Sequence, residues 1–151
     1  MQYQAVVFDM DGVIFDTERL VIEFWKEVAK KHNIPNIEHT CIQCLGTNRV
    51  RTREIFLENY GADFPFDPYR AEVTELFDTH YKGVPLPTKP GIRELLNYLQ
   101  EQDIKVGLAS STAQHLVRDE IGTAGLLPYF QTLVCGDMVE HSKPAPDIFL
   151  K

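Results

Sequence analysis

Short apolar runs alternate with helical periods toward both ends of this chain. The runs that predict strands are residues 5–8, 104–109 and 132–135. The first run leads directly into a glycine-containing turn, which is typical of a buried strand that feeds a loop. Helices are predicted between the later runs, at residues 112–121 and after Pro90-Gly91, where the inward positions are Ile92, Leu95, Leu96 and Leu99. Strands that alternate with helices of this length predict an α/β fold with a Rossmann-like, doubly wound parallel sheet.

Residues 17–83 carry only helical signals. The first predicted helix is capped by Asp16 or Thr17, ends near Asn33, and repeats apolar side chains at Val21, Phe24, Trp25, Val28 and Ala29. A second helix is predicted from about Asn48 to Tyr60, with Gly61 as a left-handed stop. The third has Asp67 as its N-cap and ends at Lys82-Gly83. We interpret the aromatic stripe of this segment as core.

A helical segment of this length is too long for a plain crossover between two strands. We therefore expect an all-α helical bundle, residues 17–83, inserted as a cap into an α/β core. The core would consist of residues 1–16 and 84–151.

Composition narrows the possible partners. The 151 residues contain 15 basic and 22 acidic side chains, a net charge of −7, which disfavours binding to a nucleic-acid backbone. No apolar stretch approaches the roughly 18 residues of a membrane span, and the N-terminus lacks a secretory pattern. We expect a cytoplasmic protein that binds neither nucleic acid nor membrane.

The three cysteines do not form a disulfide framework, which fits a reducing compartment. Cys41 and Cys44 have the spacing of a redox pair or of half a zinc site. Only His39 lies nearby as a further ligand, and the flanking residues predict a turn within a helical region. We therefore expect both to be packing residues, and Cys135 to be part of the core.

Two carboxylates, Asp9 and Asp11, follow the first predicted strand, and Gly12 allows the backbone to turn both toward one point. Such a pair suits two tasks: binding a hard cation such as Mg²⁺, and dividing nucleophilic from acid–base work. The alternative is an acidic loop that caps the next helix, which we favour for Asp16.

Two further stretches predict site residues. Ser110 ends its strand, so its hydroxyl and the amides of Ser111 and the following residue can meet a phosphate at a helix N-terminus, although an N-cap is also expected there. Lys143 stands next to a proline in Lys143-Pro144-Ala145-Pro146, which limits its mobility. Its cation can neutralise a phosphoryl group and the carboxylate of Asp9.

The run Asp9-Met10-Asp11-Gly12-Val13, with Asp16-Thr17, resembles the first motif of the haloacid dehalogenase-like hydrolases, in their phosphatase and phosphomutase branch. The end of the strand at Ser110 is similar to their second motif, and Lys143-Pro144 with Ile148-Phe149 to their third. The resemblance implies that Asp9 attacks phosphorus to give an aspartyl-phosphate while Asp11 acts as acid and base. It also implies Mg²⁺ at Asp9 and the Asp11 carbonyl, and a small phosphate ester as substrate.

The resemblance also bears on the substrate and on the alternatives. Residues 45–49 resemble a cap stretch that faces the active site in related proteins, so Arg49 is a candidate substrate contact; a solvent-facing arginine is the alternative. Mutases of the β-phosphoglucomutase type carry a histidine at the position of Val21, which favours a phosphatase over a mutase. A phospho-accepting signalling module is a third possibility, but it needs neither Asp11 nor the helical insertion.

The family has a fourth motif, an acidic pair that completes the Mg²⁺ shell, and this sequence ends at Lys151 before it. The resemblance therefore predicts that residues 5–8 form an exposed, apolar sheet edge. It also predicts that these 151 residues are a fragment with weak activity or none, unless Asp137 or Glu140 substitutes for the fourth motif.

Overall fold

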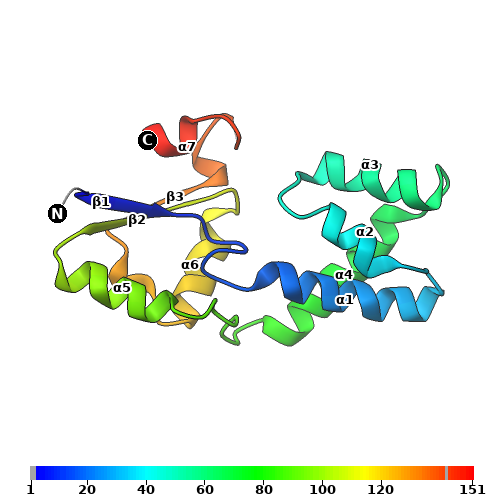
Figure 1. Ribbon diagram of the computed structural model, residues 1–151, viewed down its shortest axis with the longest axis horizontal. Coiled ribbons are helices and arrows are strands. Elements are labelled where there is room, and N and C mark those ends of the chain that lie inside the picture. Colours follow the sequence, from blue (N-terminus) through cyan, green and yellow to red (C-terminus); the bar gives the residue numbers. More distant parts are fainter. Residues whose placement is uncertain (1–2, 142) are drawn as a thin grey trace. The chain divides into compact units, whose positions relative to one another are not determined.

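Three parallel strands form one sheet in the order β1-β2-β3: β1 (Ala5–Phe8), β2 (Lys105–Ser110) and β3 (Thr132–Cys135). They are seen in a computed structural model of the chain, which describes residues 3–141 and 143–151 (Figure 1). Phe8 pairs with Leu108, and Ser110 with Cys135. The predicted parallel α/β sheet is thus confirmed, and the carboxyl ends of its strands meet at one edge.

The apolar run at residues 5–8 predicted a buried strand, but most of β1 is accessible to solvent. β1 pairs with β2 on one side only, so it lies at the edge of the described sheet. Val7 is 53% exposed, and only Phe8 is buried. The open edge expected from the family resemblance is what the structure has.

Helices cover both sides of this sheet. In Figure 1, α5 (Ile92–Glu101) and α6 (Gln114–Thr123) lie below the strands, and the short α7 (Asp147–Leu150) lies above them. Two 3₁₀ turns, η1 (Leu127–Tyr129) and η2 (Gly136–Met138), flank β3. The core contains Leu96, Leu108, Val117, Ile121 and Leu126. Leu95, predicted to face inward, is 42% exposed, because α5 buries the stripe of Ile92, Leu96 and Leu99 instead.

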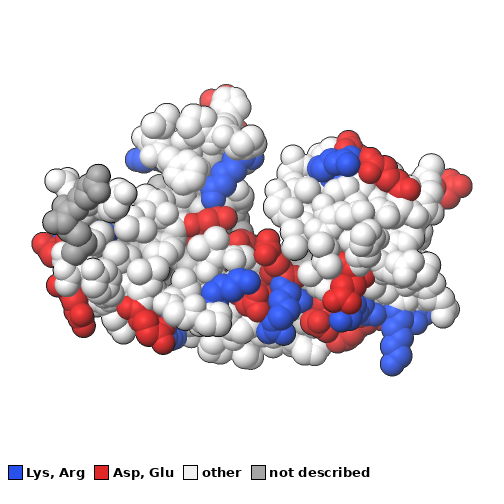
Figure 2. Space-filling view, in the orientation of Figure 1, with Lys and Arg blue, Asp and Glu red and all other residues white. Residues whose placement is uncertain are grey.

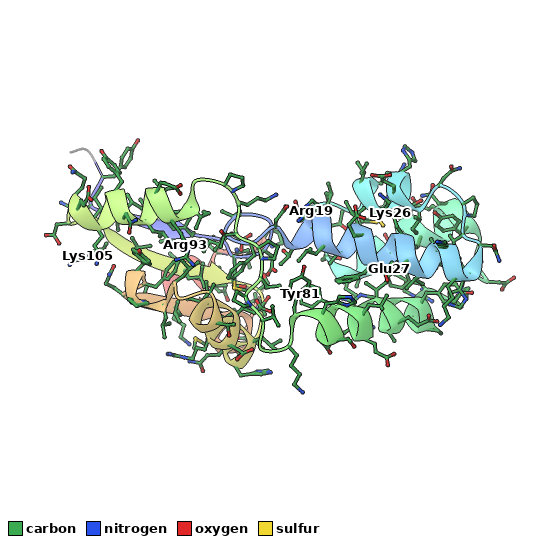
Figure 3. The ribbon with its side chains drawn as sticks, turned by 90° about the horizontal axis from the view of Figure 1, so that it is seen from below. Arg19, Lys26, Glu27, Tyr81, Arg93 and Lys105 are labelled. Atoms are coloured by element: carbon green, nitrogen blue, oxygen red, sulfur yellow. The ribbon has the colours of Figure 1, made fainter. Side chains whose placement is uncertain are left out.

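The chain divides into two compact units: residues 1–17 with 83–151, and residues 18–82. The second unit consists of helices and their connections. Its helices are α1 (Thr17–His32), whose first residue belongs to the other unit, α2 (Ile37–Gln43), α3 (Arg49–Tyr60) and α4 (Phe66–Tyr81). α1, which carries Lys26 and Glu27, runs beside α4, which ends at Tyr81 (Figure 3). No described helix is long and apolar enough to cross a membrane.

Aromatic side chains build the core of the helical unit, as the sequence predicted. The ring of Phe56 lies 4.5 Å from that of Trp25 and 5.0 Å from that of Phe66, and all three are buried. Val21, assigned to the same inward stripe, is instead 38% exposed. The buried face of α1 is formed by Leu20, Phe24, Trp25 and Val28, and Val21 lies at the margin of that face.

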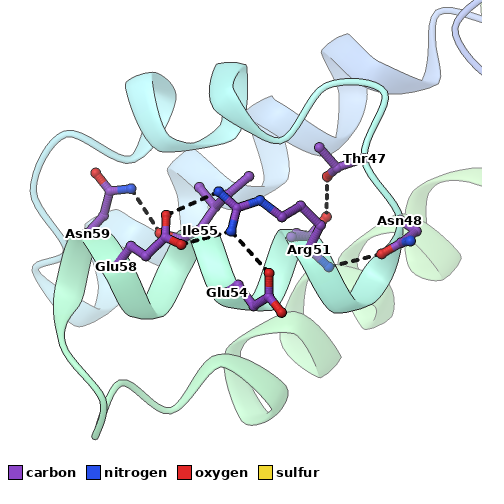
Figure 4. A network of polar contacts seen from close by, with 8 residues as sticks. Thr47, Asn48, Arg51, Glu54, Ile55, Glu58 and Asn59 are labelled. Carbon is purple, nitrogen blue, oxygen red and sulfur yellow. Dashed lines mark hydrogen bonds and ion pairs between the residues drawn. The ribbon is translucent and has the colours of Figure 1, made fainter.

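Local capping explains where one of these helices begins. Asn48 caps α3 by accepting a hydrogen bond from the amide of Arg51 (2.9 Å; Figure 4). Asp67 does not cap α4, which begins at Phe66; its carboxylate pairs with Arg49 (3.1 Å) and Arg53 (3.4 Å). No separate helix was predicted at α2, because its 7 residues lie between turns.

The surface of α3 carries mixed charge. Arg51 pairs with Glu54 (3.0 Å) and Glu58 (2.8 Å), as Figure 4 shows. Figure 2 shows acidic and basic side chains next to each other over this helix. Exposed pairs of this kind contribute little to stability, so we assign the network to solvation of the helix surface.

The cysteines lie where packing residues were expected. Cys41 and Cys135 are buried and Cys44 is half-buried, and all three are free thiols. Burial raises the pKa of Cys41 to about 12 and also raises that of Cys44. Thiols with raised pKa values are poor nucleophiles at neutral pH, so neither has the character of a redox centre.

Candidate active site

Asp9 and Lys143 meet at the carboxyl edge of the sheet. Asp9 follows β1, and its Oδ1 accepts hydrogen bonds from the Nζ of Lys143 (2.8 Å) and from the amide of Met10 (2.9 Å). The same Nζ donates to the carbonyl oxygen of Ala109 in β2 (2.7 Å). Two neighbouring strands therefore fix the ammonium group, which stands beside a solvent-accessible carboxylate.

Asp11 is held by two hydroxyl groups. Its Oδ1 accepts from Thr17 Oγ1 (3.2 Å) and its Oδ2 from Thr112 Oγ1 (3.1 Å). Gly12 adopts a left-handed conformation (φ 73°), and its amide donates to Thr17 Oγ1 (3.1 Å). Partial loss of solvent around the carboxyl group is the largest cause that raises the pKa of Asp11. The hydrogen bonds from Thr112 and Thr17 oppose that rise in part. A carboxyl group with a raised pKa retains its proton at higher pH than usual.

The end of β2 and the turn after it contribute Ser110 and Ser111. Ser110 is fully buried, and its Oγ accepts a hydrogen bond from the amide of Thr112 (3.1 Å). Ser111 is exposed next to it. Asp137, considered above as a substitute metal ligand, instead caps α6 by accepting from the amide of Gln114 (3.0 Å).

The structure thus brings most of the predicted site residues to one sheet edge. These are Asp9, Asp11, Gly12, Ser110, Ser111 and Lys143. Arg49 belongs to the other compact unit, where its side chain is exposed and pairs with Asp67. Asp16, expected to cap α1, forms a short ion pair with Lys89 (2.6 Å).

Three residues near this edge were not identified from the sequence. Thr17 was assigned only to the first motif and to a possible helix cap, and Thr112 only to the start of a helix, although both donate to Asp11. Glu120 was overlooked altogether. Its Oε2 is buried without a hydrogen-bond partner among the described residues, and burial, followed by the charges of Asp11 and Asp119, raises its pKa to about 7. A sequence signal for Glu120 was available: it lies at helical spacing from Val117, and Val117 is buried.

The candidate metal ligands at this edge are of the type that a hard cation prefers, but they are too few. Carboxylate and carbonyl oxygens at Asp9 and Asp11 are the ligands that Mg²⁺ prefers. Within the described part of the chain, however, no three His, Cys, Asp or Glu side chains come together as a metal cage. These residues can therefore supply only part of an octahedral shell.

A family model described as haloacid dehalogenase-like hydrolase matches residues 6–151, which include every residue of this edge. The chain belongs to the haloacid dehalogenase-like hydrolases. The family resemblance inferred from its motifs is confirmed.

Two curated relatives of this hydrolase are each 32% identical to it and align with 97% of its length. One is a phosphorylated carbohydrates phosphatase of Thermotoga maritima and the other a β-phosphoglucomutase of Bacillus subtilis. The aligned region makes up 68% of the first relative and 67% of the second. The chain thus spans about two thirds of the length of these relatives.

Solved structures give the same fold. A crystal structure from Thermotoga maritima, 32% identical, superimposes with a TM-score of 0.72 and covers 97% of this hydrolase and 68% of its own chain. A β-phosphoglucomutase structure from Clostridium difficile, 24% identical, has a TM-score of 0.68 and covers 99% and 69%, respectively. The relatives that share this fold include named phosphatases, so the chain is of the phosphohydrolase type.

Proposed function

We propose that this hydrolase releases phosphate from small phosphate esters through an aspartyl-phosphate on Asp9. The observation that carries the proposal is the pairing of Asp9 with Lys143 (2.8 Å) beside a second, hydroxyl-bound carboxylate at Asp11. Both hydrogen bonds described for the Asp9 side chain fall on Oδ1, which leaves Oδ2 as the attacking oxygen.

In the first step, Asp9 Oδ2 forms a bond to phosphorus and the bond from phosphorus to the ester oxygen breaks. Asp11 donates its proton to the departing alcohol oxygen, a role that its raised pKa supports. In the second step, a water oxygen forms a bond to phosphorus while Asp11 takes a proton from that water. The bond from phosphorus to Asp9 Oδ2 breaks, which releases inorganic phosphate and regenerates Asp9. Lys143 neutralises charge at Asp9 and on the phosphoryl oxygens in both steps.

Mg²⁺ would be held by the Asp9 carboxylate, the Asp11 carbonyl and at least one further oxygen ligand. When bound, it supplies positive charge that screens the approach of an anionic nucleophile to an anionic substrate. The buried Ser110 and the exposed Ser111 stand where phosphate oxygens would be bound beside the N-terminus of α6.

We propose phosphorylated sugars as the substrate class. Named relatives of this chain act on phosphorylated carbohydrates, on fructose 1-phosphate and on hexitol phosphates, which supports this choice. The helical unit, residues 18–82, would serve as the cap that selects among them, with Arg49 as a candidate contact to the sugar or its phosphate.

A phosphomutase is the second candidate, because one relative at 32% identity is a β-phosphoglucomutase. The position at which such mutases carry a histidine is Val21, whose side chain can neither donate nor accept a proton. We therefore favour hydrolysis over transfer of the phosphoryl group back to a sugar.

The test is phosphate release from p-nitrophenyl phosphate and from a panel of sugar monophosphates, with Mg²⁺ and with a chelator. Asp9→Asn should abolish release. Asp103→Asn is the matched control, because Asp103 is exposed in a left-handed turn that asparagine also adopts. Release that is insensitive to Asp9→Asn would refute the mechanism, and conversion of glucose 1-phosphate to glucose 6-phosphate without net phosphate release would favour the mutase.

A further inference from the structure

Helix α7 folds back onto the segment that carries Lys143. The Nδ1 of His141 lies 2.9 Å from Oδ2 of Asp147, the first residue of the helix. Two positions further along α7, the ring centroid of Phe149 lies 5.5 Å from the Nζ of Lys143. α7 therefore contacts both the residue two positions before Lys143 and the ammonium group of Lys143 itself.

The chemistry of the His141–Asp147 contact defines its direction. A carboxylate only accepts, so Nδ1 of His141 carries the proton and donates it. The contact lowers the pKa of Asp147, with this hydrogen bond as the largest cause. Both side chains are accessible to water, 66% for His141 and 32% for Asp147. Because exposed pairs add little to global stability, an effect of this pair on Lys143 can be separated from unfolding.

Lys143 needs such support because its ammonium group must reach two acceptors at once. Asp9 follows β1 and Ala109 belongs to β2, and their acceptor oxygens lie 2.8 and 2.7 Å from Nζ. A free lysine side chain samples many rotamers, and fixing it in one costs conformational entropy. The contact between His141 and Asp147 limits the movement of the backbone next to Lys143 and so lowers this cost.

We propose that His141 and Asp147 are positioning residues that hold the Lys143 loop so that its ammonium group reaches Asp9. The effect on turnover rests on the proposed function, whereas the effect on the lysine contact does not. A pair that merely stabilised the start of α7 would leave the hydrogen bonds of Lys143 unchanged.

The direct test is ¹⁵N NMR of the Lys143 side chain in the full chain, with the resonance assigned from its absence in Lys143→Met. Hydrogen-bonded ammonium protons exchange slowly with water and give a distinct signal. We expect His141→Ala and Asp147→Ala each to abolish it, with no further change in the double variant. His141→Asn should retain it, because the asparagine Nδ2 can donate from nearly the same place.

His39→Ala is the matched control. His39 is also exposed and also contacts one polar side chain, Gln43 (3.2 Å), but it lies in the helical unit. The Lys143 signal should be unchanged in His39→Ala. A signal that persists in folded His141→Ala, or one lost equally in His39→Ala, overturns the proposal.

The kinetic test uses phosphate release from p-nitrophenyl phosphate. His141→Ala should lower kcat about tenfold, with KM nearly unchanged. A loss of this size corresponds to part of the free energy of a charge-assisted hydrogen bond. In a Lys143→Met background the same substitution should have no further effect, and an additional loss there contradicts the proposal. If the unmodified chain releases no phosphate, the proposed function fails while the NMR experiment still decides the positioning role.

Discussion

A Cβ atom at Gly136 would overlap the carbonyl oxygen of Ser111, because the backbone after β3 crosses directly against the turn after β2. The amide of Gly136 also donates to the carbonyl oxygen of Thr112 (3.0 Å). This contact joins two loops at the edge of the sheet where the candidate active site lies. A residue with no side chain thus fixes the turn that presents Ser110 and Thr112.

We predict that Gly136→Ala destabilises the protein by about 2 kcal/mol, because neither backbone segment can yield without breaking its own hydrogen bonds. The melting temperature should fall, and phosphate release should fall with it. Gly122→Ala is the control: Gly122 lies within α6 with nothing near its Cβ position, so alanine should add about 0.5–1 kcal/mol of stability. Equal melting temperatures for the two variants would contradict the overlap.

Thr112→Val should lower kcat for phosphate release by roughly tenfold to a hundredfold, the value of a hydrogen bond to a charged group. The substitution preserves shape but removes the hydroxyl that donates to Asp11 Oδ2. Thr112→Ser keeps the donor and should retain most of the activity. Steady-state kinetics of the two variants checks this; a valine variant as active as the serine variant would show that the bond has no role in turnover.

Glu120→Gln should change how stability depends on pH. Burial raises the pKa of Glu120 from 4.5 to about 7, so between these values the unfolded chain is ionised while the folded chain keeps its proton. Stability conferred by the protonated group is therefore lost as the pH rises from about 4.5 to about 7. After allowance for solvent screening, the loss is on the order of 1 kcal/mol.

Denaturant unfolding of the two proteins at several pH values between about 4.5 and 8 measures this effect. The stability of Glu120→Gln relative to the unmodified chain should rise across that range and then level off. Glu101→Gln, at an exposed position on α5, should follow the unmodified chain. A constant difference between Glu120→Gln and the unmodified protein would refute the ionisation of Glu120 as its cause.

Cys41 should resist alkylation in the folded protein. With its pKa raised to about 12 by burial, almost none of this thiol is ionised at pH 8, and only the thiolate reacts. Mass spectrometry after brief iodoacetamide treatment should find Cys41 unmodified in native protein and modified after denaturation. Cys44, which is half-buried, should react sooner. Rapid native labelling of Cys41 would contradict its burial.

Residues with a strong local signal were placed correctly from the sequence. The strand ends at Phe8 and Ser110 follow from short apolar runs and turn residues, and Asn48 precedes its helix as a cap. Asp9 and Asp11 were assigned to the sheet edge from their place after a strand. Lys143 was identified by a different route: its place beside a proline limits its mobility, and the family resemblance supports its link to a carboxylate that lies 134 positions away along the chain.

By itself, therefore, the sequence determined the alternation of strands and helices, the parallel α/β class, the family and the residues at the sheet edge. Tertiary structure alone decided that Val21 and Leu95 face solvent and that Thr112 donates to Asp11. Periodicity and turn chemistry arise between near neighbours and can be read locally. Burial and hydrogen-bond partners depend on which distant segments pack together, which no local pattern encodes.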